Sequence, residues 1–245
     1  MSEEVLERLA TRLESATRLT VLTGAGVSAA SGVPTFRGAE GLWRQFSPQD
    51  LATPQAFARD PELVWEWYAW RREKVAACDP NGAHRVIAGW SQHDGCRVVT
   101  QNVDDLHERA GSRRVVHMHG ELLSALCDSC QGRFAWDDDL GDGPACPGCG
   151  NDTLRPDVVW FGEMPYDLDL IERALVRADL FVAIGTSGAV YPAAGFVRMA
   201  TRSGAKTLEL NLDSSETSHL FDDARQGPAG KLVPEWVADV QALSR

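Results

Sequence analysis

The segment GAGVSAASGVPTFRG, residues 24–38, contains four glycines and directly follows the short apolar run LTVLT. An apolar run of this kind predicts a buried strand. Glycines directly after a strand allow a tight turn, in which backbone N–H groups can approach a diphosphate at the N-terminus of the next helix. The residues that fit this dinucleotide-binding fingerprint are Gly24, Ala25, Gly26, Ser28 and Ala29. The alternative interpretation is a glycine turn that is shaped by packing alone.

Further apolar runs follow along the chain, and each ends in a polar or glycine-rich turn. They are CRVVTQN, RRVVHMHG, PDVVWFG, ADLFVAIGTS and KTLELNL. Helices are expected between them at 61–77, 82–92, 168–177 and 193–201, and an amphipathic helix is expected within the first 16 residues. Strands that alternate with helices predict an α/β fold with a mostly parallel, doubly wound, Rossmann-like sheet. Ligands of such sheets bind beyond the carboxyl ends of the strands, so the chemistry is expected along one edge.

Composition and charge narrow the classes of function. The 245 residues carry a formal net charge of −11, which argues against a nucleic-acid partner, because phosphate binding normally needs a basic face. No apolar run approaches the roughly 18 residues that a membrane span requires, so no membrane partner is expected. The first four residues, MSEE, are acidic where a targeting peptide would be basic, and a cytoplasmic protein is therefore expected.

Four of the six cysteines form two CxxC pairs, Cys127 with Cys130 and Cys146 with Cys149, separated by fifteen residues. This spacing is typical of a tetrahedral zinc site. Four thiolates close the coordination shell, so the predicted metal is structural. A zinc ribbon that binds nucleic acid is the alternative, but the residues between the pairs are acidic. The isolated Cys78 and Cys96 are interpreted as small buried hydrophobes.

The dinucleotide interpretation lacks one element of ordinary dehydrogenases, because no convincing acidic residue follows the glycines by about 20 positions to hold a ribose hydroxyl. Instead, six segments occur in order: GAGVSAASGVPTFRG, TQNVDDLHERAG, HMHGEL, PDVVWFGE, GTSGAVYPAA and LELNLD. Together they resemble the sirtuins, the NAD-dependent protein lysine deacylases, over nearly the whole chain. The resemblance implies one catalytic domain over 1–245, with a Rossmann-like NAD-binding core at 1–119 and 156–245 and a small zinc-binding insert at 120–155. An acyl-lysine peptide would lie in the cleft between them.

The resemblance also assigns the cofactor contacts. Asn102 and Asp104 would line the nicotinamide side and Gln101 would contact the ribose, while Phe36 would shield the ribose from water and Arg37 would support the loop. The remaining NAD contacts implied are Thr35, Trp43, Gly185, Thr186, Ser187, Asn211, Leu212, Asp213 and Ala229, in addition to the glycine fingerprint. Asp105, His107 and Glu108, by contrast, are predicted to be solvated helix residues without a role in the site.

The segment HMHGEL offers two histidines for general base catalysis. A near-neutral imidazole can accept a proton from a ribose hydroxyl at physiological pH. On the sequence alone either His117 or His119 could serve. The sirtuin pattern assigns the base to the histidine before glycine, which is His119.

The segment VVWFGE, residues 158–163, is predicted to be an edge strand to which an extended substrate peptide adds by main-chain hydrogen bonds. A core strand ending at Gly162 is the other interpretation, and both can hold at once. The substrate contacts expected here are Val159, Trp160, Phe161, Gly162 and Glu163.

Tyr68 and Arg71, in WEWYAWRREKV, are three residues apart and therefore neighbours on one helix face. In the sirtuin subgroup of desuccinylase and demalonylase type, a Tyr-x-x-Arg pair here receives the distal carboxylate of the acyl chain. Arginine suits that role because its planar fork binds carboxylate bidentately. Thr35, where sirtuins usually carry aspartate, resembles the same subgroup. The alternative is a packed tryptophan face with Arg71 and Arg72 in solvent.

The resemblance thus implies an enzyme that removes acetyl and, preferentially, succinyl, malonyl or glutaryl groups from lysine. The acyl oxygen would attack the anomeric carbon of the NAD ribose as nicotinamide leaves, and His119 would deprotonate a ribose hydroxyl. The products would be free lysine, nicotinamide and O-acyl-ADP-ribose, and the partners would be proteins or peptides with acylated lysine. Two other hypotheses use the same cofactor site: a protein ADP-ribosyltransferase and a non-catalytic NAD sensor.

Overall fold

The structure is a computed structural model that describes residues 18–35, 47–137 and 143–243. The amphipathic helix expected near the N-terminus lies outside the described residues, as do the predicted cofactor contacts Phe36, Arg37 and Trp43. Within the described part of the chain, no helix combines the length and the apolar character needed to cross a membrane.

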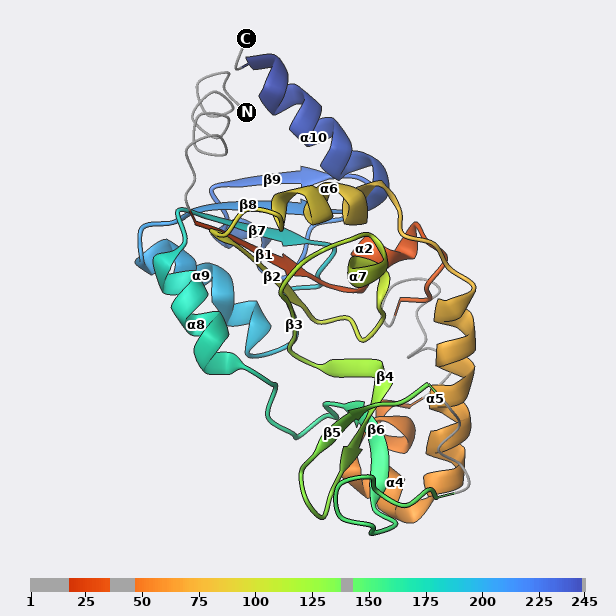
Figure 1. Ribbon diagram of the computed structural model, residues 1–245. Helices are drawn as coiled ribbons and strands as arrows, with labels where there is room; N and C mark the ends of the chain where they lie inside the picture. Colours follow the sequence, from red (N-terminus) through yellow and green to blue (C-terminus); the bar gives the residue numbers. More distant parts are fainter. Residues whose placement is uncertain (1–17, 36–46, 138–142, 244–245) are drawn as a thin grey trace.

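A six-stranded parallel sheet lies at the centre of the larger lobe (Figure 1), in the order β3-β2-β1-β7-β8-β9. Its strands are β1 (Leu19–Thr23), β2 (Cys96–Thr100), β3 (Val115–His117), β7 (Leu180–Ile184), β8 (Lys206–Asn211) and β9 (Asp223–Gln226). The chain runs outward to one side of β1 and later to the other, so the order reverses between β1 and β7. Loops beyond such a reversal diverge and leave a crevice for ligands. The predicted α/β, Rossmann-like fold class is confirmed.

Both faces of this sheet are covered by helices (Figure 1). Alternate side chains of β1 point to opposite faces of the sheet, as expected for a strand. Val21 packs with residues of α6 (Gly82–Trp90) and α10 (Ala229–Leu243), whereas Leu22 packs with residues of α8 (Leu168–Arg177) and α9 (Phe196–Arg202). Three of the predicted helices therefore lie where they were expected, and the fourth, at 193–201, is a 3₁₀ turn (Ala193–Gly195) that continues into α9.

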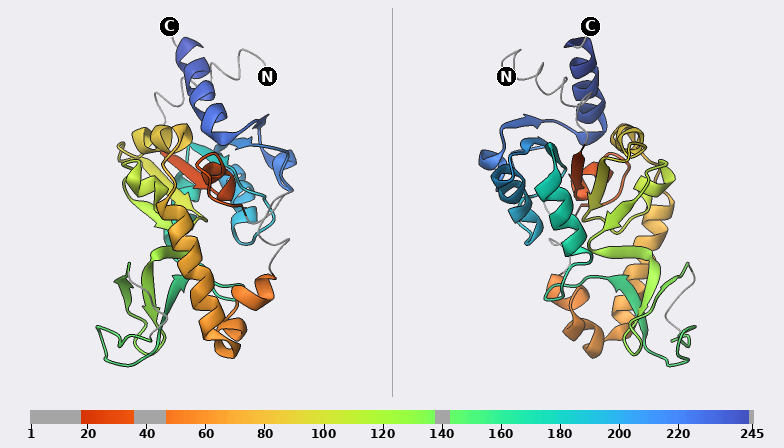
Figure 2. Two further views of the ribbon diagram at one scale, coloured as in Figure 1. Left: turned by 90° about the vertical axis from the view of Figure 1, so that its right-hand side faces the viewer. Right: turned by 60° about the vertical axis from the view of Figure 1, so that its left-hand side comes forward.

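A smaller, antiparallel sheet lies beside the carboxyl edge of the parallel one, in the order β5-β4-β6. It consists of β4 (Gly120–Cys127), β5 (Arg133–Ala135) and β6 (Leu154–Val158). The helices α3 (Pro48–Leu51), α4 (Pro54–Arg59) and α5 (Pro61–Ala76) share its core, and Figures 1 and 2 show α5 running along it. The division of the chain at 119/120 and 155/156 stays a prediction.

The helix α5 matters for the site because it carries Tyr68 and Arg71. Asp60 caps it by accepting a hydrogen bond from the Leu63 N–H at 3.0 Å, and Pro61 occupies the first helical position, where its missing N–H costs nothing. Buried Val64 and Trp67 then anchor the helix in a cluster that also contains Leu122 of β4. The position of the Tyr68–Arg71 face is thereby fixed relative to the small sheet.

The prediction that PDVVWFG forms a strand of the parallel sheet is wrong, and so is the edge strand expected at 158–163. The first residues of PDVVWFG belong to β6. This strand pairs antiparallel with β4 and ends at Val158. Beyond it, the Val159 and Phe161 N–H groups donate to carbonyls of His119 and Ala52, and the chain turns at Gly162, where φ is +95°. An apolar run alone does not reveal its partner strand, and the sequence does not indicate that the His119 and Ala52 carbonyls accept these hydrogen bonds.

The glycine loop packs tightly against the loop that follows β7. The Gly26 N–H donates to the Gly185 carbonyl at 2.8 Å, and a Cβ on Gly26 would lie 2.7 Å from Gly185 Cα. Gly185 itself has φ of +64°, and a Cβ there would lie 2.4 Å from Val27 N. Gly26 lies in the first turn of the short helix α2 (Ala25–Ala29), whose N-cap is Gly24. Packing therefore explains part of the glycine pattern.

We predict that Gly185→Ala lowers the free energy of unfolding by about 2–4 kcal/mol, because it adds a backbone clash to a left-handed conformation. Gly89 in α6 is the matched control, since a Cβ there meets nothing within 4 Å. Gly89→Ala should raise the free energy of unfolding by up to about 1 kcal/mol. Urea denaturation measures both values, and equal effects of the two substitutions would contradict the steric account.

Candidate active site

A cavity of about 790 Å³ lies between the carboxyl edge of the parallel sheet and the smaller lobe. Its wall is formed by the loops after β1, β2, β7 and β8, by α5 and by residues 158–163. The predicted site residues that line it are Gly24, Ala25, Gly26, Ala29, Thr35, Tyr68, Arg71, Gln101, Asn102, His119, Val159, Trp160, Phe161, Gly162, Glu163, Gly185, Thr186, Ser187, Asn211, Leu212, Asp213 and Ala229. Segments far apart in the sequence therefore meet in one place.

Side-chain hydrogen bonds tie the loops of this wall together. The Gln101 amide donates to the Thr186 hydroxyl at 2.9 Å, and the Asn211 amide donates to the Thr186 carbonyl at 2.7 Å. These two bonds join the loops after β2, β7 and β8. These bonds therefore fix the relative positions of the polar groups that would meet a nucleotide.

Sequence reasoning missed several lining residues. Val190 and Tyr191 follow the GTSG turn, and Tyr191 is a largely exposed aromatic residue near the cavity. Ser214, Ser215 and Glu216 extend the wall beyond Asp213. The segment GTSGAVYPAA contained the signal for the first pair, since its length exceeds what a ribose turn needs.

Ser28 and Asp104 are not among the lining residues, and their contact with a cofactor stays a prediction. The Ser28 hydroxyl donates to Asp104 Oδ2 at 3.0 Å and accepts a hydrogen bond from the Asn102 amide at 3.1 Å. Burial raises the pKa of Asp104, against the hydrogen bonds from Leu106 N–H and Ser28. Both residues therefore form a buried support that fixes the orientation of Asn102 in the wall.

The half-buried His119 is prepared to act as a base. Its Nδ1 lies 3.1 Å from the Gln101 carbonyl, and because a carbonyl can only accept, Nδ1 carries the proton. This leaves Nε2 as the acceptor. Burial lowers the pKa of His119, although the bond to Gln101 opposes the shift. The imidazole is therefore neutral at physiological pH and able to take up a proton.

His117 has a pKa that is shifted in the opposite direction. Its Nδ1 donates to the Asn102 carbonyl at 3.1 Å, and its Nε2 lies 3.0 Å from Glu108 Oε1 and 3.7 Å from Glu121 Oε1. Burial opposes its charge, but the hydrogen bond to Glu108 and the two carboxylates outweigh burial and raise the pKa of His117. Both ring nitrogens of His117 therefore have partners, whereas Nε2 of His119 is left as an acceptor, so the structure distinguishes two histidines that the sequence left equivalent.

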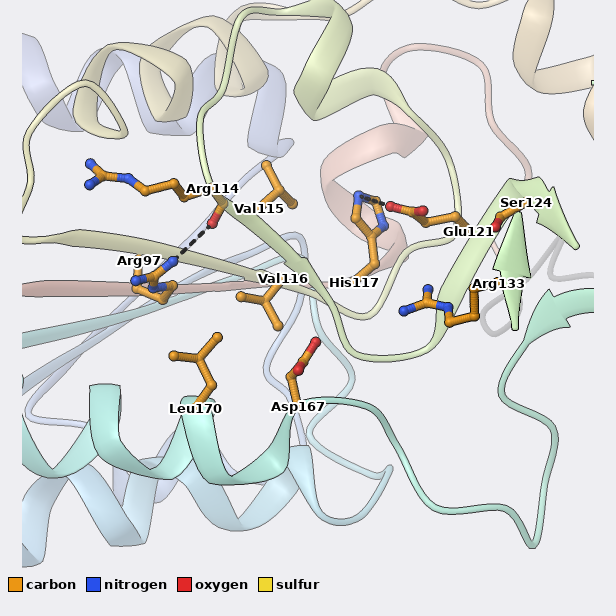
Figure 3. Close-up of a pocket in the computed structure, with 10 residues that line it drawn as sticks. All are labelled: Arg97, Arg114, Val115, Val116, His117, Glu121, Ser124, Arg133, Asp167 and Leu170. Carbon is orange, nitrogen blue, oxygen red and sulfur yellow. Dashed lines mark hydrogen bonds and ion pairs between the residues drawn. The ribbon is translucent and has the colours of Figure 1, made fainter. Parts of the chain in front are cut away.

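The two histidines also face different cavities. His117 lines a second cavity of about 470 Å³ beside Arg97, Arg114 and Arg133, and Figure 3 shows its ring next to Glu121. His119 lines the larger cavity with Asn102. The change of side occurs because β3 ends at His117, so the alternation of a regular strand does not continue.

The prediction that His107 is a solvated helix residue is wrong, whereas Glu108 is an exposed residue of a helix, as predicted. His107, on the short helix α7 (Leu106–Arg109), is fully buried, and its Nε2 lies 2.9 Å from the Thr23 hydroxyl at the end of β1. Burial lowers the pKa of His107 to about 3. Glu108 is the partner of His117. Polar composition suggested solvent exposure here, but α7 packs against the sheet edge.

Tyr68 and Arg71 are both buried in the wall of the larger cavity. The interpretation with Arg71 in solvent is therefore wrong, because its exposed fraction is only 8%. Burial lowers the pKa of Arg71, whereas Tyr68 and Asp104 favour its charge. A guanidinium stays protonated in proteins even so. The Tyr68 hydroxyl accepts a hydrogen bond from Trp160 Nε1 at 2.9 Å, which joins α5 to the turn after β6.

The four paired cysteines meet at one point of the smaller lobe. Their Sγ atoms all lie within 4.8 Å of one another, and the Cys127–Cys149 and Cys130–Cys146 separations are both 3.7 Å. Four sulfurs around a tetrahedral zinc with Zn–S bonds of about 2.3 Å would be separated by about 3.8 Å, so the residues fit the ion. No cysteine of the four lines the large cavity. The site therefore suits a structural zinc.

Comparisons with known proteins agree with this geometry. The model of the Sir2 family matches residues 24–192, more than half of the chain. The NAD-dependent protein deacylase SIR2rp3 of Leishmania major is 51% identical over 230 residues, which cover 91% of this chain and 95% of that protein. A Sir2 homologue solved in complex with ADP-ribose superposes with a TM-score of 0.90 and 45% identity, covering 100% of this chain and 98% of that one. Sir2Af2 bound to a myristoylated histone peptide superposes with a TM-score of 0.76 and 30% identity, covering 99% of each chain.

An NAD-sized cleft at the edge of a Rossmann-like sheet, with a neutral histidine and a four-cysteine zinc module, defines a sirtuin-type protein. The chain belongs to the Sir2 family. It is an NAD-dependent protein deacylase, with NAD as co-substrate and one structural zinc ion. The expected family, cofactors and enzyme class are confirmed.

We predict that His119→Ala lowers kcat/KM for deacylation by about 10²–10⁴-fold, because the base that accepts the proton is lost. In the wild-type enzyme, activity should be full where His119 is neutral and fall as the pH drops through its pKa, which lies below the ordinary imidazole value of about 6.5. His117→Gln should keep this acid limb of the pH profile, whatever its effect on the rate. A wild-type rate in His119→Ala, or an acid limb removed by His117→Gln, would refute the assignment.

For the metal site, we expect the double substitution Cys146→Ala and Cys149→Ala to abolish bound zinc and to lower the melting temperature, since metal binding is part of the folding free energy. Cys78→Ser is the control, because Cys78 lies outside the cluster and should keep a full complement of one zinc ion per chain. Metal analysis and thermal melting measure both effects. Unchanged zinc content in the double variant would show that these cysteines do not hold the ion.

Proposed function

We propose that this deacylase acts preferentially on lysine that carries an acidic acyl group, such as succinyl, malonyl or glutaryl. The observation that carries the proposal is the pair of buried side chains Tyr68 and Arg71 in the wall of the NAD cleft. A buried cation is costly to desolvate and favours an anionic partner in the same cavity. Arginine in addition offers a planar fork that matches both oxygens of a carboxylate.

Tyr68 supports the same preference through the direction of its hydroxyl group. Its oxygen accepts the Trp160 indole N–H, so its own hydrogen is available to an acceptor in the cavity. Burial raises the pKa of Tyr68, which keeps the hydroxyl protonated and therefore able to donate. A distal carboxylate would meet a charged fork and a neutral donor, whereas an acetyl group would reach neither.

The remaining wall supports transfer of the acyl group to NAD. When bound, NAD supplies the nicotinamide that leaves and the ribose that receives the acyl group. Gln101, Thr186 and Asn211 hold the loops that would position the ribose, and Asn102, oriented by Ser28, would face the nicotinamide side. His119 would accept the ribose hydroxyl proton at Nε2. The enzyme would release lysine, nicotinamide and O-acyl-ADP-ribose.

The substrate would be a protein or peptide with an acylated lysine. Phe161 and Tyr191 line the same cavity and are both exposed, so they offer apolar surface to a polypeptide at its entrance. The related Sir2Af2 is bound to an acylated histone peptide, which supports this class of substrate.

We predict that Arg71→Met lowers kcat/KM for a succinyl-lysine peptide by about 10–150-fold, the range expected for losing a hydrogen-bonded charge pair. Methionine keeps the apolar length of the side chain, so kcat/KM for the acetyl-lysine peptide of the same sequence should fall by less than about threefold. Tyr68→Phe should show a weaker effect in the same direction. Mass spectrometry of both peptides with NAD measures these values. An equal loss of both reactions in Arg71→Met would mean that Arg71 does not recognise the carboxylate.

A further inference from the structure

We propose that Arg155 is a positioning residue for acyl selectivity, through which the zinc module holds the Trp160–Tyr68 wall of the acyl pocket. This inference deepens the proposed function and rests on it. Arg155 does not line the cleft and no sequence motif above singled it out. It lies on β6 directly opposite Leu126, the residue that precedes the zinc ligand Cys127 on β4.

Every nitrogen of the Arg155 guanidinium has an acceptor. Nε donates to Asp128 Oδ1 at 2.9 Å, Nη2 to Glu163 Oε1 at 2.7 Å, and Nη1 to the Val158 carbonyl at 3.3 Å. The side chain is only 7% exposed. A planar group with bonds on three sides has one orientation, so Arg155 is a rigid link between its partners.

One end of this link is the zinc knuckle. Asp128 lies between the ligands Cys127 and Cys130, and the Asp128 N–H donates to the Thr153 carbonyl at 2.9 Å. Zinc held by Cys127 and Cys130 would close the knuckle and give the Asp128 carboxylate a defined position from which to hold Arg155.

The other end of the link is the acyl pocket. The Arg155 guanidinium stacks on the Trp160 ring, 4.3 Å from its centroid. Glu163, held by Arg155 through one oxygen, accepts the Trp160 backbone N–H at 2.8 Å through the other. Both the ring and the backbone of Trp160 are thereby fixed, and the ring N–H in turn orients the Tyr68 hydroxyl. Displacement of Arg155 would move the Tyr68 hydroxyl, which would donate to the carboxylate of an acidic acyl group. An acetyl group has no carboxylate to accept that hydrogen bond.

The same small sheet contains a matched arrangement that does not reach the pocket. Arg133 donates to the buried Asp157 at 2.7 Å and stacks on the Tyr166 ring, 4.3 Å from its centroid. Neither Arg133 nor Tyr166 lines the large cavity. Substitution of Arg133, which is 39% exposed against 7% for Arg155, therefore perturbs an ion pair and a ring contact of the same kind without touching Trp160 or Tyr68.

The experiment compares Arg155→Lys and Asp128→Asn with the controls Arg133→Lys and Asp152→Asn, where Asp152 is an exposed acidic residue of the same module. Lysine keeps the charge but loses the fork and the stacked plane. For each protein, kcat and KM are measured with succinyl-lysine and acetyl-lysine peptides of one sequence. Equilibrium binding of the labelled peptides without NAD, zinc content and melting temperature are measured alongside.

We expect Arg155→Lys to lower the ratio of succinyl to acetyl kcat/KM by about tenfold or more, because a small misplacement of a positioned group suffices for such a loss. Asp128→Asn should shift the ratio in the same direction by a smaller factor. Binding of the succinyl peptide should weaken in parallel, while zinc content stays at one ion per chain. The two controls should keep the wild-type ratio even if they melt at a lower temperature.

The outcomes that would overturn the inference are distinguishable from one another. A wild-type enzyme that prefers the succinyl peptide, with an unchanged ratio in Arg155→Lys and Asp128→Asn or the same shift in Arg133→Lys, contradicts the role of Arg155 alone. A wild-type enzyme that prefers the acetyl peptide contradicts the proposed function and this inference together. Equal loss of both activities in Arg155→Lys would show a purely structural residue.

Discussion

The contact between the loops after β1 and β7 determines where the rest of the site lies. At this point the strand order of the parallel sheet reverses, and the Gly26 N–H donates to the Gly185 carbonyl at a separation that leaves no room for side chains. The contact joins the glycine segment after β1 to the Thr186 loop, and the hydrogen bond from Gln101 to Thr186 adds the loop after β2. The small lobe then closes the cleft from the other side through α5 and the turn after β6.

Within that cleft, burial affects the protonation of different groups in different ways. It keeps His119 neutral and therefore basic, and it keeps Tyr68 protonated and therefore a donor. It also surrounds Arg71 with low-dielectric walls, where a charge pair is worth more than in water. His117 shows the contrast, because the carboxylates of Glu108 and Glu121 reverse the effect of burial two residues away. One cavity thus holds a neutral base for acyl transfer, together with the donor and the cation that the proposed acyl preference requires.

Much of this site could be predicted from the sequence, because its signals are local. The glycine fingerprint, the two CxxC pairs and the Tyr68–Arg71 spacing each depend on a few neighbouring residues. What depends on distant partners could not be predicted. The antiparallel pairing of β6, the burial of His107 against Thr23, and the link from Asp128 through Arg155 to Trp160 all join segments far apart in the chain. The opposite pKa shifts of His117 and His119 also depend on partners distant in the chain.

The central claim is that one cleft uses NAD to remove acyl groups from lysine and recognises the acid at their far end. The most direct test is to offer the wild-type enzyme one peptide with acetyl, succinyl, malonyl or glutaryl lysine in turn, with and without NAD, and to follow products by mass spectrometry. The account predicts NAD-dependent release of every acyl group with higher kcat/KM for the acidic ones. Faster removal of acetyl than of all three acidic groups, or turnover without NAD, would contradict it.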